Sequence, residues 1–222
     1  MGLRVQALAS PRILCEKSPT NATDLATLQR AERIFDNPVY IHLVRHPFSA
    51  IASSAKLRAK QLLLLGVESP STDPRASWQT QQDDWARTNS IILQHLKGVP
   101  AERQTTLRYE DLVQAPESQL RGLCGFLGLP YAPQMCTPYQ GSNLALFQAA
   151  DAHQPSTNHP DVLKHKGIDP SLADAWRTVR VPRPLGAQAC TIATQLRYAF
   201  RPLCPGADAA LDTRGVSARP RR

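Results

Sequence analysis

The sequence predicts an α/β fold, with a parallel sheet flanked by helices. The main observation is the run Val39–Val44, whose β-branched, aromatic and aliphatic side chains are typical of a strand covered on both faces. A helix is predicted to begin at Pro47, because proline suits the first turn of a helix. An earlier apolar run, Arg12–Cys15, precedes the strand by one helix length, and this strand–helix–strand order favours parallel pairing.

The helix that connects these two strands is predicted from the residues at its start and end. Ser18–Asn21 has turn chemistry that can start a helix, and apolar residues follow at helical spacing over Leu25–Phe35. Asp36–Pro38 is predicted to end that helix before the strand begins. The next helix is expected from Pro47 to about Leu65.

A loop rich in Gly, Ser, Pro and Asp is predicted over Gly66–Pro74, followed by a long helix over Arg75–Leu96. Its predicted buried stripe carries Trp78, Trp85 and Ile92. The next strand is expected over Thr105–Tyr109, ending in Glu110 and Asp111. These three residues, from Tyr109 to Asp111, are interpreted as structural, with Asp111 as a possible helix cap.

The C-terminal half is predicted to be less regular. A helix over Pro116–Phe126 is expected to end at Gly128. In residues 132–167 the apolar residues follow neither the helical nor the strand spacing. Short helices are expected over Asp169–Arg177 and Ala187–Leu196. We predict one domain over residues 1–204 and a disordered tail over residues 205–222.

Composition excludes several classes of protein. The formal charge of +8 suits an anionic ligand such as a nucleotide, but the basic residues form no stripe with interleaved aromatics, which argues against nucleic-acid binding. No apolar run is long enough to span a bilayer, and no signal peptide is recognisable, so we predict a cytoplasmic protein without membrane partners. The five scattered cysteines are interpreted as reduced thiols.

An anion site is predicted where the strand turns into the helix. Arg45 stands at the carboxyl end of the strand, where its guanidinium can bind a phosphate through paired hydrogen bonds. Ser49 and Ser53 are four residues apart and share one face of the helix. The competing interpretations are a surface ion pair for Arg45 and a helix hydroxyl bonded to a carbonyl for Ser53.

Three segments, in the same order, resemble PAPS-dependent sulfotransferases of the bacterial, polyketide-associated type, which are related to carbohydrate sulfotransferases. They are VRHPFSAIASS at Val44–Ser54, CEKSPTN at Cys15–Asn21, and LRYEDL at Leu107–Leu112 with FLGLPY at Phe126–Tyr131. The resemblance implies a P-loop-kinase-like fold and PAPS as co-substrate, with no metal. It also implies that Arg45 and Ser53 hold the 3′-phosphate, whereas Ser49 and Ser54 are interpreted as exposed helix hydroxyls.

Two catalytic residues are predicted. Lys17 follows the first predicted strand at the same sheet edge as Arg45, where its charge would stabilise the transferring sulfuryl group; a solvated lysine is the alternative. His165, in LKHKGID, lies in a segment similar to the family's late substrate-and-nucleotide loop and is the first candidate for general base. His46 is interpreted as packed in the turn, and Glu16 as a structural partner of a cation.

The family's 5′-phosphosulfate loop has no counterpart before Cys15, and no GxxxxGK[ST] segment occurs elsewhere. We therefore expect a domain that is incomplete at its N-terminus and transfers sulfate to a hydroxyl acceptor, small or carrier-bound, weakly or not at all. The alternative is a non-catalytic PAP- or PAPS-binding remnant or partner subunit, whose unpaired sheet edge would invite a protein that completes the sheet. A phosphotransferase is a more distant alternative, because it would require a Walker loop and a magnesium carboxylate.

Overall fold

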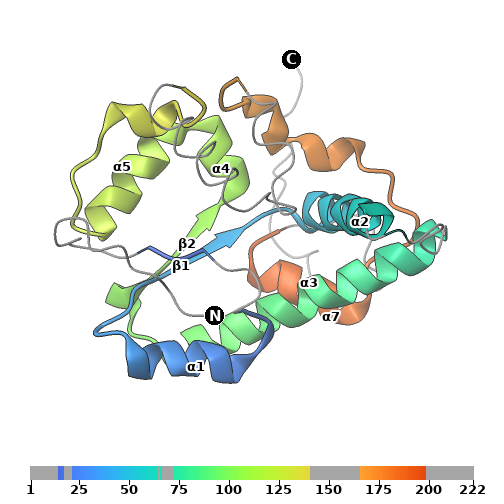
Figure 1. Ribbon diagram of the computed structural model, residues 1–222, viewed down its shortest axis with the longest axis horizontal. Coiled ribbons are helices and arrows are strands. Elements are labelled where there is room, and N and C mark those ends of the chain that lie inside the picture. The colour runs from blue at the N-terminus through green and yellow to red at the C-terminus, as the bar shows by residue number, and fades with distance from the viewer. Residues whose placement is uncertain (1–14, 18–21, 65, 67–72, 141–165, 199–222) are drawn as a thin grey trace, which may run out of the picture.

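The computed structural model describes residues 15–17, 22–64, 66, 73–140 and 166–198. Two strands, β1 Tyr40–Val44 and β2 Gln104–Arg108, lie at its centre, as Figure 1 shows. The α-helices are α1 Leu25–Ile34, α2 Pro47–Leu64, α3 Pro74–Leu96, α4 Tyr109–Gln114, α5 Pro116–Phe126 and α7 Ala187–Gln195. Short 3-10 helices are η2 Ala101–Arg103, η3 Pro133–Cys136, η5 Pro170–Ala173 and η6 Ala175–Thr178.

The two strands are parallel, with Tyr40 opposite Gln104 and Val44 opposite Arg108. Parallel pairing requires a long crossover, and α2 and α3 supply it. The predicted α/β fold is therefore confirmed. One boundary prediction is wrong: Tyr109 does not end β2 but begins α4, and Asp111 lies inside that helix instead of capping it.

Local signals in the sequence set the helix ends. Asp24 caps α1 by accepting hydrogen bonds from the backbone of Ala26 and Thr27, and Asp73 caps α3 in the same way through Arg75. Gly128 adopts φ 65° after α5, a left-handed conformation that glycine takes without steric cost. The predicted helix bounds from Pro47 to Phe126 therefore hold to within one residue.

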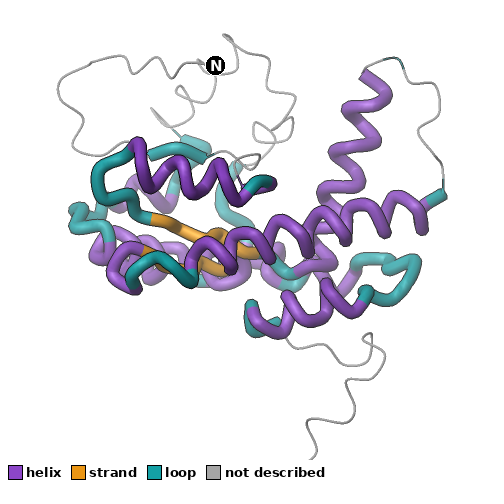
Figure 2. The backbone as a smooth tube through the Cα atoms, turned by 90° about the horizontal axis from the view of Figure 1, so that it is seen from below, coloured by secondary structure: helices purple, strands orange, loops and turns teal. Residues whose placement is uncertain are grey.

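The main core joins α2, α3 and α7. Phe48 and Ile51 on α2 pack against Trp78 and Ala86 on α3, and Ala189 of α7 completes the cluster together with Leu185. Figure 2 shows that α3 runs from the side of the outer end of α2 back toward the strands. The core between these two helices therefore extends to the sheet. The predicted burial of Trp78 is confirmed, whereas Trp85 and Ile92 are only partly buried.

The two faces of β1 differ. Val44 is buried against Ile192, Leu196 and Tyr198, so α7 and the residues after it cover the inner face. On the other face Ile41 is 38% exposed and Leu43 is 57% exposed. The prediction that this strand is covered on both faces is therefore wrong for the structure described.

Buried polar side chains tie these elements together. His42, on the inner face of β1, forms a 3.0 Å hydrogen bond between its Nε2 and Oδ1 of Asn89 on α3. Gln82, almost fully buried on α3, accepts a 3.0 Å hydrogen bond from the backbone N–H of Gly186, just before α7. Such paired groups fix helix registers that apolar packing alone leaves adjustable.

Three further predictions concern the chain's environment and its end. Within the described residues, no helix is long and apolar enough to cross a membrane. Cys15, Cys124 and Cys136 are free, but Cys190 is disulfide-bonded, so the prediction of five reduced thiols is wrong at that position. The strand predicted at Arg12–Cys15 lies almost entirely outside the described residues, and the tail predicted over residues 205–222 lies wholly outside them.

Candidate anion site at the β1–α2 turn

Arg45 occupies the position immediately after β1, between the strand and the first turn of α2. Parallel strands place their carboxyl ends at one edge of the sheet, where open α/β proteins bind ligands. Arg108, the last residue of β2, lies at the same edge because it pairs with Val44. Two arginines therefore stand at this edge, Arg45 directly after β1 and Arg108 at the end of β2.

Of these two arginines, Arg45 is the one whose guanidinium can bind a ligand. Its guanidinium carbon lies 4.5 Å from the ring centroid of Tyr109, a cation–π contact. Arg45 forms no hydrogen bond or ion pair with any other described residue, and its Nε is buried. The ring fixes the plane of the guanidinium while leaving its donors to a ligand, so the surface ion pair considered from the sequence is not found in the described structure.

Arg108, by contrast, is engaged with its surroundings. Its guanidinium lies 4.4 Å from the ring centroid of Tyr198, its Nη1 donates to the backbone carbonyl of Arg197 at 3.4 Å, and its Nε lies 3.9 Å from a carboxylate oxygen of Asp111. These contacts use the side chain for packing, so of the two arginines Arg45 is the better candidate for an anion.

The serines of α2 occupy different environments. Ser53 is exposed, and so is Ser54. Ser49, one turn before Ser53, is buried, so the prediction of an exposed hydroxyl is wrong for Ser49 and holds for Ser54. Ser53 is accessible to a ligand, but its assignment to a phosphate stays a prediction.

His46, next to Arg45, is packed in the turn as the sequence predicted. Its ring stacks on Trp176 at 4.2 Å between centroids and meets the rings of Phe48 and Tyr198 edge-on. Burial and the nearby charges of Arg108 and Arg177 lower the pKa of His46 to about 4. A histidine held neutral in this aromatic cluster is part of the scaffold of the turn.

A buried carboxylate links this turn to α4. Glu110 accepts a 2.8 Å hydrogen bond from the backbone N–H of His46 through Oε1, and a 2.9 Å hydrogen bond from the hydroxyl of Tyr198 through Oε2. Sequence reasoning classed Tyr109 and Glu110 as structural but did not connect them to Arg45, and it missed Tyr198. The motif LRYEDL pointed to Tyr109 and Glu110, whereas Tyr198 lies outside every segment that the sequence analysis singled out.

The two predicted catalytic residues are not placed in this site. Lys17 is exposed in an irregular segment, as is Glu16, and both form interactions there. His165 lies outside the described residues. Their proximity to Arg45 therefore stays a prediction. Among the described residues, no group of three or more His, Cys, Asp or Glu side chains could hold a metal ion.

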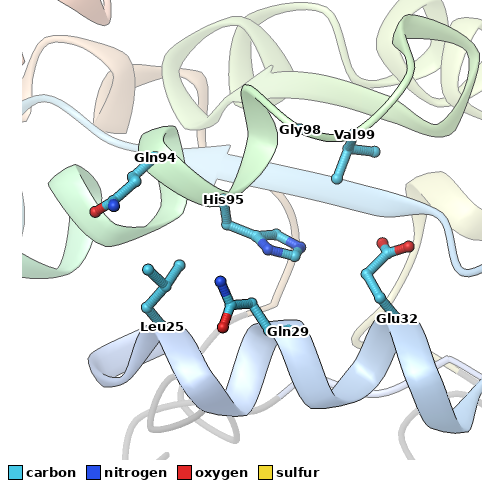
Figure 3. A pocket seen from close by; sticks show the side chains of 7 residues that line it. All are labelled: Leu25, Gln29, Glu32, Gln94, His95, Gly98 and Val99. Atoms are coloured by element: carbon cyan, nitrogen blue, oxygen red, sulfur yellow. The ribbon is translucent and has the colours of Figure 1, made fainter.

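A cavity of about 310 Å³ lies elsewhere, between α1 and the end of α3 (Figure 3). Glu32 at its edge binds the Arg103 guanidinium at 3.1 Å, next to Tyr40, which begins β1. Burial alone would raise the pKa of Glu32, but the hydrogen bonds and charge of Arg103 bring that pKa below its usual value. This cavity lies toward the amino ends of the strands and so is separate from Arg45. Its lining residues are Leu25, Gln29, Glu32, Gln94, His95, Gly98 and Val99.

A parallel α/β fold, with an arginine at a strand end directly before a serine-bearing helix, is the arrangement in which open α/β proteins bind ligands. Comparison with family models makes this class specific. Residues 3–133, more than half of the chain, match the model described as "Sulfotransferase family". The chain therefore belongs to the sulfotransferase family.

Solved structures agree with this assignment. The chain is similar to the "Sulfotransferase Domain from the Curacin Biosynthetic Pathway", with 37% identity, a TM-score of 0.70, and coverage of 86% of this chain and 64% of that one. It is also similar to the "Sulfotransferase Domain from the Synechococcus PCC 7002 Olefin Synthase", with 32% identity, a TM-score of 0.69, and coverage of 85% and 60%. The chain thus spans somewhat less than two thirds of either domain. The comparison with curated proteins found no match.

Proposed function

We propose that this chain is a sulfotransferase domain that binds PAPS, or its product PAP, for transfer of a sulfuryl group to a hydroxyl acceptor, and that the isolated chain performs this transfer weakly or not at all. The observation that carries the proposal is Arg45, a cation at the carboxyl end of β1 that stacks on Tyr109 and has no carboxylate partner among the described residues. Arg45 would bind the 3′-phosphate through paired hydrogen bonds, and the exposed hydroxyl of Ser53 would add a further donor.

The chemistry assigned to the remaining residues follows from what sulfuryl transfer requires. The reaction resembles phosphoryl transfer, in which in-line positioning and charge stabilisation account for most of the catalysis. Lys17 would stabilise the charge on the transferring group, and His165 would take the proton of the acceptor hydroxyl, since a histidine of ordinary pKa titrates near working pH. The described residues support neither role directly.

The proposal predicts that PAP binds more tightly than adenosine 5′-phosphate, which lacks the 3′-phosphate. A paired arginine–phosphate contact contributes roughly 1.5–3 kcal/mol, so the expected ratio of the two dissociation constants is about 10 to 100. Calorimetric titration of both nucleotides into the purified chain at one salt concentration measures it. Equal affinities, or no binding of PAP by the folded chain, would contradict the proposed function.

The acceptor is proposed only as a class. The two similar domains are described as parts of a biosynthetic pathway and of an olefin synthase. We propose that this chain also acts on a hydroxyl of a small molecule or of a carrier-bound intermediate. Acceptor pockets are built from loops that vary with substrate, so fold similarity does not define the acceptor further.

A second candidate function is a non-catalytic PAP- or PAPS-binding chain that acts with a partner. The observation that favours it is the exposed face of β1, where Ile41 and Leu43 lie uncovered, as does Val39 just before the strand. Parallel sheets are normally covered on both faces, so this face suits a further protein element that would pack against it. The partner would bring apolar side chains to that face.

The turnover of the isolated chain distinguishes the two functions. We expect weak transfer or none, because the 222 residues contain no GxxxxGK[ST] segment whose backbone amides could hold the 5′-phosphosulfate. Incubating the chain with labelled PAPS and a mixture of alcohols, and counting labelled sulfate esters, measures it. Robust turnover would refute this expectation and remove the second candidate, whereas PAP binding without turnover would favour that candidate.

A further inference from the structure

Glu110 joins three distant parts of the chain through one buried carboxylate. It is 8% exposed, in the first turn of α4, directly after β2. One oxygen accepts from the backbone N–H of His46 and the other from the hydroxyl of Tyr198, at 2.8 and 2.9 Å. Both oxygens of this charge are therefore used within the fold, at residues 64 and 88 positions away.

The bond to His46 acts on Arg45. The N–H of His46 belongs to the planar peptide unit that begins at the carbonyl of Arg45, so fixing this N–H fixes the backbone rotation on the carbonyl side of Arg45. β2 cannot supply this restraint, because it ends at Arg108, opposite Val44. The Glu110 carboxylate therefore restrains the backbone just beyond the last residue pair of the two strands.

The neighbour of Glu110 restrains the other half of Arg45. Tyr109 carries the ring on which the Arg45 guanidinium rests, 4.5 Å from the centroid. Two consecutive residues of α4 thus hold the backbone and the side chain of the same arginine. The aromatic group and the carboxylate are both supplied by the segment LRYEDL, far in sequence from the β1–α2 turn.

We propose that Glu110 is a positioning residue for the anion site, which presents Arg45 to the phosphate through the backbone of His46. The inference rests on the proposed function, because it assumes that the anion is the 3′-phosphate of PAP or PAPS. Preorganisation is the physical reason: a binding group held in its productive geometry loses less freedom when the ligand arrives. What matters is the reach of the hydrogen-bond acceptor and not its negative charge, which by itself would repel a phosphate.

Two substitutions separate reach from charge. Glu110→Gln keeps an oxygen that can accept from His46 and loses the charge, whereas Glu110→Asp keeps the charge and shortens the side chain by one methylene. We expect Glu110→Asp to weaken PAP binding by about tenfold or more, because displacing a binding group by ~1 Å is costly, and to leave adenosine 5′-phosphate binding nearly unchanged. Glu110→Gln should bind PAP within about threefold of the unchanged chain.

The readout is the ratio of the two dissociation constants, measured by calorimetry. A loss of stability alone would scale down the folded fraction for both nucleotides and leave this ratio intact, so urea unfolding of each variant is run alongside. Glu117→Gln is the matched control, because Glu117 is an exposed glutamate on α5 paired only with Arg121 in the described contacts. Tyr198→Phe tests the other oxygen and should lower stability without changing the ratio.

The outcomes distinguish a failure of the positioning role of Glu110 from a failure of the proposed function. The positioning role is supported if Glu110→Asp reduces the preference for PAP over adenosine 5′-phosphate and Glu110→Gln keeps that preference. An unchanged ratio in Glu110→Asp, an equal loss in both variants, or a loss in Glu110→Gln alone would overturn it while PAP binding by the unchanged chain upholds the function. Absence of PAP binding by the unchanged chain would overturn both.

Discussion

Replacing Arg45 with alanine is expected to weaken PAP binding by roughly 100-fold, about 3 kcal/mol, because hydrogen bonds to charged groups are worth ~1.5–3 kcal/mol and a guanidinium can form two to one phosphate. The folded state should change little, since Arg45 forms no hydrogen bond or ion pair with the described residues and makes a cation–π contact with the ring of Tyr109. A large effect on binding with a small effect on stability is the signature of a binding residue.

Calorimetric titration of PAP at constant salt measures this effect, and constant salt is needed because screening changes any charge–charge contribution. Arg121→Ala is the control, as Arg121 is an exposed arginine on α5 that pairs with Glu117. The PAP affinity of Arg45→Lys should lie between those of Arg45→Ala and Arg121→Ala, because an ammonium keeps the charge but lacks the planar fork of the guanidinium. Unchanged PAP affinity in Arg45→Ala would remove Arg45 from the phosphate site and with it the main support for the proposed function.

The local parts of this fold could be predicted because each is signalled within a few residues. Pro47 marks the start of α2 and Gly128 the end of α5, and both ends are found there, whereas α3 begins at Pro74, one residue before its predicted start. Proline, capping side chains and glycine act through their own backbone geometry, so they need no information from the rest of the chain. The same locality made the β1–α2 turn readable.

The partners of the turn could not be predicted for the opposite reason. Glu110 meets His46 across 64 residues and Tyr198 across 88, and Trp176 stacks on His46 from η6. Such contacts depend on how β1 and β2 pair and on where the chain returns after α7. The apolar run of β1 likewise shows that a strand prefers burial but not whether a neighbour covers it, which is why exposed Ile41 and Leu43 were unexpected.

We expect the free energy of unfolding to fall as the pH is lowered from about 6.5 to 4, mainly because of His46. Burial first, and then the charges of Arg108 on β2 and Arg177 on η6, lower the pKa of His46 from 6.5 to about 4. The Glu110 carboxylate of α4 is already occupied by the His46 backbone and Tyr198. The imidazole therefore stays neutral in the folded chain at pH values where the unfolded chain protonates it.

The sign follows from proton binding. Between pH 6.5 and 4 the unfolded state binds one more proton at His46 than the folded state, so acid favours unfolding, and below pH 4 the loss is complete. A shift of this size corresponds to about 3 kcal/mol at most. Burial also lowers the pKa values of His42 and His95, which adds to the loss in the same direction.

Urea unfolding between pH 7.5 and 5 measures this dependence, and that range lies above the titration of Glu32, whose pKa is lowered by its pairing with Arg103 despite burial. His46→Gln, which cannot titrate, should be less stable at pH 7.5, because it loses the stacking on Trp176, yet should show a shallower decline with falling pH. Proton magnetic resonance of the imidazole gives the pKa of His46 directly. A pKa at or above 6.5, or an equal decline in His46→Gln, would contradict the prediction.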